Sequence, residues 1–92
     1  MAKVIITLKI MPDSPETDLD KIEEQTKILI AEFAGETETK TEQEPIAFGL
    51  KALKILFVAD EAKGSTDELE TKINLIEGVS SVETTDVRRA IG

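Results

Sequence analysis

The most apolar stretch of the chain, Leu53 to Ala59, constrains the fold more than any other feature. It follows a segment in which Pro45 breaks regular structure and Gly49 permits a tight turn. In an antiparallel protein this pattern predicts a turn that leads into a central strand, here Lys51 to Ala59. Alternation along this strand predicts that Leu53, Ile55 and Phe57 face the core, with Leu56 and Val58 on the other side.

Phe48 lies at the tip of this predicted turn, between Ala47 and Gly49. The sequence contains only three aromatic residues, so a phenylalanine at a turn requires an explanation. One explanation is structural, with the ring covering one end of the core. The other is functional, with the ring displayed to a partner. The residues alone leave both open.

The N-terminal residues alternate with period two, which predicts a first strand with Val4, Ile6, Leu8 and Ile10 on its apolar face. The segment from Met11 to Pro15 ends this strand. We expect Asp13 or Ser14 to cap a helix over residues 15–34, with Pro15 in its first turn and Gly35 as its C-terminal stop. Its apolar stripe contains Leu19, Ile22, Thr26, Leu29, Ile30 and Phe33. Phe33 on such a stripe is assigned to the core and not to function.

Residues 36–44 (ETETKTEQE) alternate threonine with charge and contain no aliphatic side chain. Such a composition is compatible with disorder, but the β-propensity of threonine favours an edge strand whose charges oppose aggregation. Residues 60–64 are expected to form a loop. Ser65 and Glu68 form a predicted capping box for a second helix that contains Leu69, Ile73 and Ile76 and ends at Gly78. A last strand is expected within residues 79–91.

The predicted order is strand, helix, strand, strand, helix, strand in one domain covering residues 1–92. Right-handed crossovers interleave the two strand-helix-strand units into a four-stranded antiparallel sheet of order 4-1-3-2, with both helices on one face. The predicted fold is therefore an α+β ferredoxin-like sandwich. It places the 11–15 loop and the 47–49 turn at one end of the sheet, and the 60–64 loop and the C-terminus at the other.

Cysteine and histidine are both absent from the sequence. This composition excludes disulfides, thiolate metal sites and cysteine nucleophiles. Acid–base chemistry would fall to Asp, Glu and Lys, whose unperturbed pKa values lie far from neutrality. We therefore predict a protein that is not an enzyme and needs no cofactor. Asp60 and Glu61 could hold a divalent ion, although adjacent loop carboxylates are usually only solvated.

The chain carries 11 Lys and Arg residues against 19 Asp and Glu residues, a net charge of −8. An acidic domain gains no counterion-release energy from phosphate backbones, so nucleic acid is not an expected partner. A protein with a basic face would be attracted instead. No apolar run reaches the roughly 20 residues that cross a membrane, and residues 1–11 do not form a signal-peptide core. The prediction is a cytoplasmic protein.

The segment Pro45 to Lys54 (PIAFGLKALK) resembles the Pro-Ile/Val-Gly-Phe/Tyr-Gly-Ile-Lys-Lys-Leu stretch of the guanine-nucleotide exchange domain of translation elongation factor 1-beta. The resemblance continues through the strand from Ile55 to Asp60. Residues 16–18 (ETD) are similar to the family's Glu-Thr-Asp before the first helix, and Asp86-Val87 to its Asp-Val/Ile near the C-terminus. The length of 92 residues resembles that of the short archaeal form.

This resemblance implies that the protein promotes release of GDP from elongation factor 1-alpha so that GTP can bind during protein synthesis. It implies that Phe48 and Gly49 contact the GTPase, with Ala47 and Lys51 beside them. The family's tail also reaches toward the nucleotide's magnesium site with a lysine next to the last residue. Here Ile91 is next to last, and the basic residues nearby are Arg88 and Arg89, which follow Asp86. These three residues form the second implied contact.

A function of another class is compatible with the same fold. A ferredoxin-like domain could sense a small molecule or assemble into oligomers through an open sheet face bearing Ile5, Leu56 and Val58. An exchange factor that acts on one GTPase is expected to be a monomer when free, so the oligomeric state separates the two.

Overall fold

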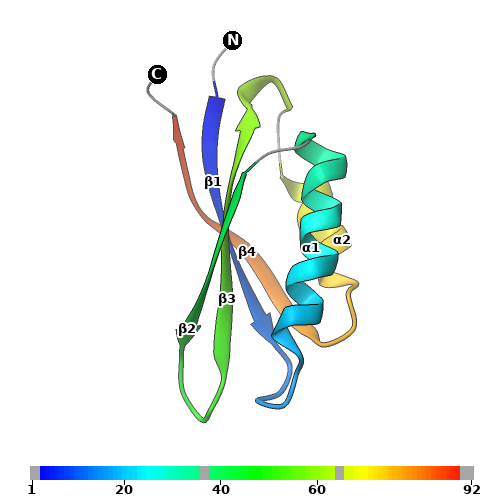
Figure 1. Cartoon of the computed structure of the whole chain (residues 1–92), viewed down its shortest axis with the longest axis vertical. Helices are drawn as coiled ribbons and strands as arrows, with labels where there is room; N and C mark the ends of the chain where they lie inside the picture. Colours follow the sequence, from blue (N-terminus) through cyan, green and yellow to red (C-terminus); the bar gives the residue numbers. More distant parts are fainter. Residues whose placement is uncertain (1–2, 36–37, 64–65, 90–92) are drawn as a thin grey trace.

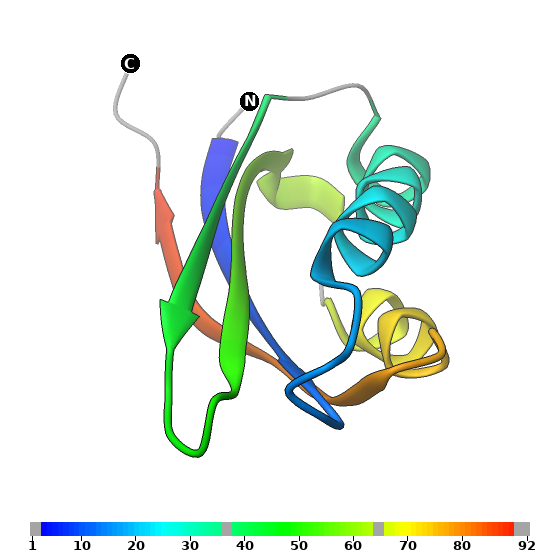
Figure 2. The ribbon, with the colours of Figure 1, turned by 60° about the horizontal axis from the view of Figure 1, so that its bottom comes forward.

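Strands and helices follow one another in the predicted order. The computed structural model describes residues 3–35, 38–63 and 66–89 (Figure 1). Its elements are β1 (Lys3–Pro12), α1 (Leu19–Ala34), β2 (Thr39–Pro45), β3 (Lys51–Asp60), the short 3-10 helix η1 (Glu61–Lys63), α2 (Asp67–Asn74) and β4 (Val79–Arg89). Within the described residues, the four strands form one antiparallel sheet of order β2-β3-β1-β4, which is the predicted 4-1-3-2 read from the other edge. Both helices cover the same face of this sheet (Figure 2). The ferredoxin-like α+β prediction is confirmed.

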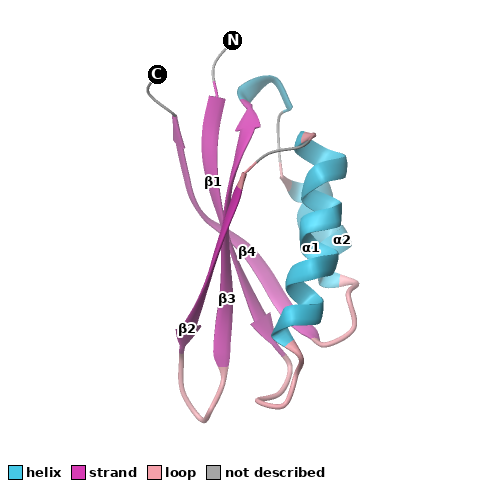
Figure 3. Ribbon diagram, in the orientation of Figure 1, coloured by secondary structure: helices cyan, strands magenta, loops and turns pink. Residues whose placement is uncertain are grey.

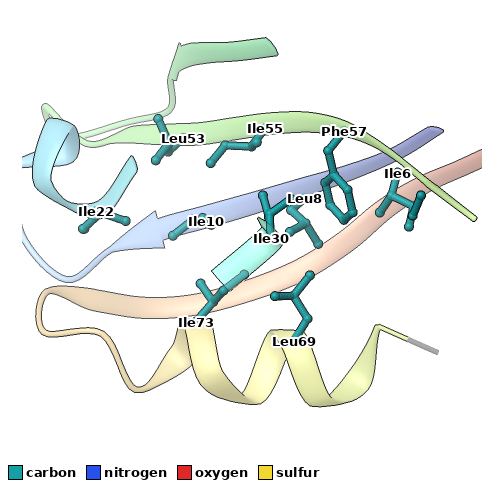
Figure 4. Close-up of a cluster of buried hydrophobic side chains, with 11 residues drawn as sticks. Ile6, Leu8, Ile10, Ile22, Ile30, Leu53, Ile55, Phe57, Leu69 and Ile73 are labelled. Atoms are coloured by element: carbon teal, nitrogen blue, oxygen red, sulfur yellow. The ribbon is translucent and has the colours of Figure 1, made fainter. Parts of the chain in front are cut away.

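The core lies between the helices and the two central strands. Ile6, Leu8 and Ile10 of β1 pair with Phe57, Ile55 and Leu53 of β3, respectively, and all six side chains are buried. Alternation places them on the helix side, where Ile22 and Ile30 of α1 and Leu69 and Ile73 of α2 complete the cluster (Figure 4). Phe33 packs edge-on against Phe57, with ring centroids 6.4 Å apart. The predicted core assignment of Phe33 is confirmed.

Helix α1 begins at Leu19, and the predicted start at residue 15 is wrong. The cap is Asp18, whose Oδ1 accepts hydrogen bonds from the backbone N–H groups of Asp20 and Lys21 at 3.1 and 3.2 Å. Ser14 instead uses its Oγ to accept a bond from the Glu16 N–H at 3.0 Å, which stabilises a turn. This segment contains several residues that could cap a helix, and the helix begins after Asp18, the one directly before the apolar stripe. The predicted stop at Gly35 is confirmed, with its N–H donating to the Ala31 oxygen.

The other boundaries differ by a few residues. Strand β2 pairs along one edge of β3, so the predicted edge strand is confirmed for residues 39–44. Residues 36 and 37 of that prediction lie outside the described residues. The prediction that Pro45 breaks regular structure is wrong, because Pro45 is the last residue of β2, and an edge strand accommodates proline.

Helix α2 has its cap at Thr66 and ends at Asn74. The predicted capping box is therefore wrong in its cap position, and its Ser65 lies outside the described residues. The last residues of the predicted final strand, 90 and 91, also lie outside them.

Three connections meet at one end of the sheet (Figure 3). They are the β1–α1 loop, the β2–β3 turn and the α2–β4 loop. The N–H of Asp13 donates to the oxygen of Gly78 at 2.9 Å, which joins the first loop to the third. A Cβ added at Gly49 would lie 3.6 Å from the Cβ of Pro15, so the first loop also contacts the β2–β3 turn. The β1–α1 loop thus lies between the other two. No helix in the described part of the chain could cross a membrane.

Candidate functional site

A tight turn connects β2 to β3. The N–H of Leu50 donates to the oxygen of Ala47 at 2.9 Å, and the N–H of Ile46 donates to the oxygen of Leu50 at 2.9 Å. Both central residues have positive φ, +56° at Phe48 and +80° at Gly49. This combination of bond and φ signs is that of a type I′ turn, whose twist matches that of the flanking strands. Gly49 adopts such a φ without steric cost, whereas Phe48 does not.

Phe48 is the most exposed large apolar residue in the described part of the chain. Its side chain is 94% exposed, and its backbone adopts a left-handed conformation that costs a non-glycine residue roughly 1–2 kcal/mol. The structural explanation, in which Phe48 covers one end of the core, is therefore wrong. A bulky apolar residue in this conformation stabilises neither the turn nor the core. Strained and exposed positions of this kind concentrate at functional sites.

The base of the hairpin is held by pairing between its strands. Pro45 lies opposite Lys51, and Lys54 of β3 forms an ion pair with Glu44 of β2 at 3.6 Å. Beyond this base, Ile46 is 42% exposed, so two apolar side chains are available on a five-residue connection. The turn therefore presents a small apolar surface on a short, hydrogen-bonded support.

A shallow groove of ≈ 280 Å³ lies beside the turn. The β1–α1 loop contributes Pro15 and Thr17, the start of α1 contributes Asp18 and Asp20, and the hairpin contributes Gln43, Gly49 and Lys51. The predicted site residues Ala47, Phe48, Gly49 and Lys51 therefore lie together at this end, as the sequence implied. Lys51 is exposed and stands opposite the acidic start of α1 across this groove.

The other predicted site residues lie on β4, at the opposite end of the sheet. Arg88 forms an ion pair with Asp86, Nε to Oδ2 at 2.7 Å, in which the arginine side chain is largely exposed and the aspartate side chain is partly buried. Arg89 forms an ion pair with Glu61 of η1 at 2.9 Å. Both arginines belong to the strand, because Val4 pairs with Arg89 and Ile5 with Arg88. The structure brings Arg88 and Asp86 together on the open face of the sheet, places Arg89 on the helix side beside Glu61, and separates all three from Phe48.

The predicted loop carboxylates are already engaged by the protein. The Oδ1 of Asp60 accepts a hydrogen bond from the Ala62 N–H at 2.9 Å, and Glu61 is paired with Arg89. Among residues 3–35, 38–63 and 66–89, no group of three or more potential ligands is placed to hold a metal ion. These two carboxylates form a loop-stabilising pair of contacts.

Two exposed apolar residues on the helical layer were not singled out by the sequence. Ile28 of α1 is 58% exposed, and Leu75, directly after α2, is 79% exposed. Ile28 could have been noticed, because it lies on the side of the helix opposite the apolar stripe. Leu75 could not, because the predicted helix continued through it to Ile76.

The fold and this end of the sheet define a class: a small ferredoxin-like domain with an exposed aromatic residue on a hairpin turn. Comparison with known proteins identifies the family within this class. Residues 5–90 match the EF-1 guanine nucleotide exchange domain. The chain therefore belongs to the EF-1 guanine nucleotide exchange domain family.

Full-length relatives support the same assignment. The chain is 44% identical over 89 residues to elongation factor 1-beta of Methanothermobacter thermautotrophicus, which covers 97% of this chain and 98% of the relative. It is 40% identical over 90 residues to elongation factor 1-beta of Staphylothermus marinus, with the same coverage. It is 41% identical over 87 residues to that of Pyrococcus abyssi, covering 94% of this chain and 93% of the relative. These relatives are archaeal, in agreement with the resemblance noted from the length.

Proposed function

We propose that this protein is a guanine-nucleotide exchange factor that promotes release of GDP from the translation GTPase elongation factor 1-alpha and allows GTP to rebind. Family membership supports the exchange role. The single observation that carries the proposal is Phe48, which is 94% exposed on a strained turn. No bond is made or broken in exchange, so the protein acts by binding and not as an enzyme.

Phe48 acts as an anchor that enters an apolar pocket of the GTPase. Burial of an aromatic side chain at the centre of an interface contributes a few kcal/mol, and such residues dominate binding energies. The turn around it is closed by its own backbone bonds, so little conformational entropy is lost on binding. Gly49 keeps the backbone narrow beside the ring, and Ala47 and Lys51 contact the surface around the pocket.

Exchange requires that the factor binds the nucleotide-free GTPase much better than the GDP-bound form. If the GTPase holds GDP with nanomolar affinity, about 12 kcal/mol must be offset in part by the new contacts. Linkage makes the effect reciprocal, so GDP weakens binding of the factor by the same ratio that the factor weakens binding of GDP. The pocket for Phe48 must therefore be more accessible in the empty state.

Asp86, Arg88 and Arg89 form a second contact. They lie at the C-terminal end of β4, separated from the Phe48 turn by the length of the ten-residue strand β3, roughly 33 Å. A GTPase that touches both groups extends along the sheet. Arg88 and Arg89 then act near the nucleotide's magnesium site, where the family uses a lysine, although a planar guanidinium binds with different geometry from an ammonium group.

The direct experiment measures release of a fluorescent GDP analogue from elongation factor 1-alpha in excess unlabelled nucleotide. The unmodified protein should accelerate release with saturation. Phe48→Ala should reduce the acceleration by about tenfold or more, because an interface anchor is removed. Its circular dichroism should be unchanged, since the side chain is almost completely exposed.

Leu75→Ala is the matched control. It also truncates a strongly exposed apolar side chain, 79% exposed, but on the helical layer. Its exchange activity should equal that of the unmodified protein. Normal exchange by Phe48→Ala, or an equal loss in both variants, would contradict the proposal.

The alternative of assembly or ligand sensing through the open sheet face receives little support. Ile5, Leu56 and Val58 are each only partly exposed, and none is among the strongly exposed apolar residues of the described chain. We therefore propose a factor that is monomeric when free and binds its GTPase one-to-one.

A further inference from the structure

The outer surface of the helical layer has an apolar groove that the exchange proposal does not use. Helices α1 and α2 lie side by side over the sheet (Figure 2). Between their outward sides is a groove of ≈ 390 Å³ lined by Ile28 and Leu29 of α1 and by Leu75 and Ile76 after α2. Lys72 and Glu77 also line it. We propose that this groove binds a basic amphipathic helix of a protein partner.

The floor of the groove is fixed and its walls are exposed. Leu29 and Ile76 pack against the core cluster, so they cannot move without disturbing it. Ile28 and Leu75 stand above them and are 58% and 79% exposed. Neither side chain supports the core, which Ile22, Thr26 and Ile30 fill from α1. Apolar residues beside a preformed floor are suited to receive the apolar face of another helix.

Charge around the groove specifies the partner's chemistry. Glu24 and Glu32 lie one helical turn before and after Ile28, on the same side of α1. Glu77 lines the groove itself, with Lys72 as the opposing charge. Helices α1 and α2 together contain seven acidic and three basic residues, whereas the four strands contain five acidic and seven basic residues. The helices thus carry a net charge of −4 and the strands one of +2, so the helical layer is more acidic than the sheet and attracts a partner with Lys or Arg beside its apolar residues.

A second copy of this protein is a poor occupant of the same groove. Two copies facing each other through their helical layers would bring like charges together, which costs free energy in an interface. A single basic helix avoids this repulsion. The inference does not depend on the proposed exchange activity, because no residue of the groove belongs to the Phe48 turn or to the β4 arginines.

The test uses a fluorescent probe peptide of about 18 residues, or five helical turns, with Leu at i, i+3, i+4 and i+7 spacing and Lys elsewhere. A scrambled peptide of the same composition has no apolar face. Fluorescence anisotropy with the full chain should show binding of the amphipathic peptide and at least tenfold weaker binding of the scrambled one. Equal binding of both peptides would mean attraction by charge alone and would overturn the proposal, as would no binding.

Leu75→Glu and Val87→Glu form a matched pair of variants. Each replaces an exposed apolar residue, 79% and 56% exposed, by a negative charge, and Val87 lies on β4 outside the groove. Charge alone predicts that both variants bind the basic peptide more tightly. The proposal predicts that Leu75→Glu weakens binding at least tenfold, while Val87→Glu does not weaken it. The proposal would be overturned if Leu75→Glu bound the peptide as well as the unmodified protein does. It would also be overturned if the unmodified protein sedimented as a dimer without peptide and Leu75→Glu dissociated that dimer, because the groove would then bind a second copy.

Discussion

At Phe48, backbone and side chain both adopt states that folding alone disfavours. The left-handed φ of +56° is costly for a bulky residue, and 94% exposure leaves the ring in water. Gly49 lowers the cost of the turn by taking the second positive φ, and the Leu50–Ala47 hydrogen bond closes it. The conformational cost at Phe48 is small compared with the stabilisation that burial of the core provides, so the protein folds despite this strain.

The strain can be measured by two substitutions of the same residue. Phe48→Gly and Phe48→Ala both remove the ring, but only glycine adopts the native φ without steric cost. Phe48→Gly should therefore be more stable than Phe48→Ala by about 1 kcal/mol in urea unfolding, with equal m values. Exchange activity should be equally low in both. Equal stability would indicate that residue 48 does not hold a left-handed conformation in solution.

Among the elements, the strands were more predictable than the ends of the helices. Period-two alternation in β1 and β3 identifies their buried faces, because a register shift of one residue would expose Leu8 and Ile55. The start of α1 was mislocated because Asp13, Ser14 and Asp18 are all capable caps, and only packing of Leu19 against the core decides between them. The β-bulge that shifts the β1–β4 register after Thr7 has no signal in the sequence.

The candidate site was located from sequence, but its geometry was not. The positions of Pro45 and Gly49 and the family resemblance were sufficient to select Phe48. Its positive φ could not be predicted, since type I′ turns are usually marked by Asn-Gly or Asp-Gly and not by Phe-Gly. The exposure of Leu75 could not be predicted either, because it depends on where α2 ends. That boundary is set by packing of Ile73 and Ile76 against the core.

The contact between the β1–α1 and α2–β4 loops is testable through Gly78. A Cβ at Gly78 would lie 2.9 Å from Cγ2 of Thr17, and φ is +95°, whereas a Cβ at Gly35 would meet no atom within 4 Å at φ +80°. Gly35 has φ +80° and ψ −174°, a conformation adopted almost only by glycine, so Gly35→Ala should cost about 1–3 kcal/mol through backbone strain alone. Gly78→Ala should cost about 1–3 kcal/mol more, because a β-branched side chain must move. Thermal unfolding gives both values.

A rescue experiment separates the collision from the strain. Thr17→Ser removes Cγ2 but keeps the hydroxyl that donates to the Asp13 carboxylate at 3.0 Å. In this background, the cost of Gly78→Ala should fall to that of Gly35→Ala. If Thr17→Ser does not reduce the cost of Gly78→Ala, the whole loss of stability comes from backbone strain at residue 78.

At the scale of the whole molecule, the two proposed contacts lie far apart. The longest dimension is 42 Å, with the β2–β3 turn at one end and the end of β4 near the other (Figure 1). Both arginines lie on β4, and each forms an exposed ion pair, Arg88 with Asp86 and Arg89 with Glu61, so their guanidinium groups are accessible to a partner. An exchange factor with contacts this far apart can hold the GTPase at one end while acting on the nucleotide at the other.

This division predicts different effects of Arg89→Ala and Glu61→Gln. Both break the 2.9 Å Arg89–Glu61 ion pair, but only the first removes the cation. Arg89→Ala should lower the maximal exchange rate by about fivefold, equivalent to about 1 kcal/mol, while affinity for the GTPase changes less. Glu61→Gln should leave the rate near normal. An equal loss in both variants would show that Arg89 serves the fold of this chain and not the partner.

The helices carry a net charge of −4 and the strands one of +2, so charge is distributed unevenly between the two layers. In the electric field of a charged partner, such a molecule experiences a torque as well as a net force. It therefore rotates relative to the partner before the two surfaces come into contact. At physiological ionic strength this torque acts only within about 8 Å, the Debye length. A partner with a basic region is therefore turned toward the helical layer before contact. The direction of first approach is thus set by the arrangement of layers, independently of which side chains later form the contact.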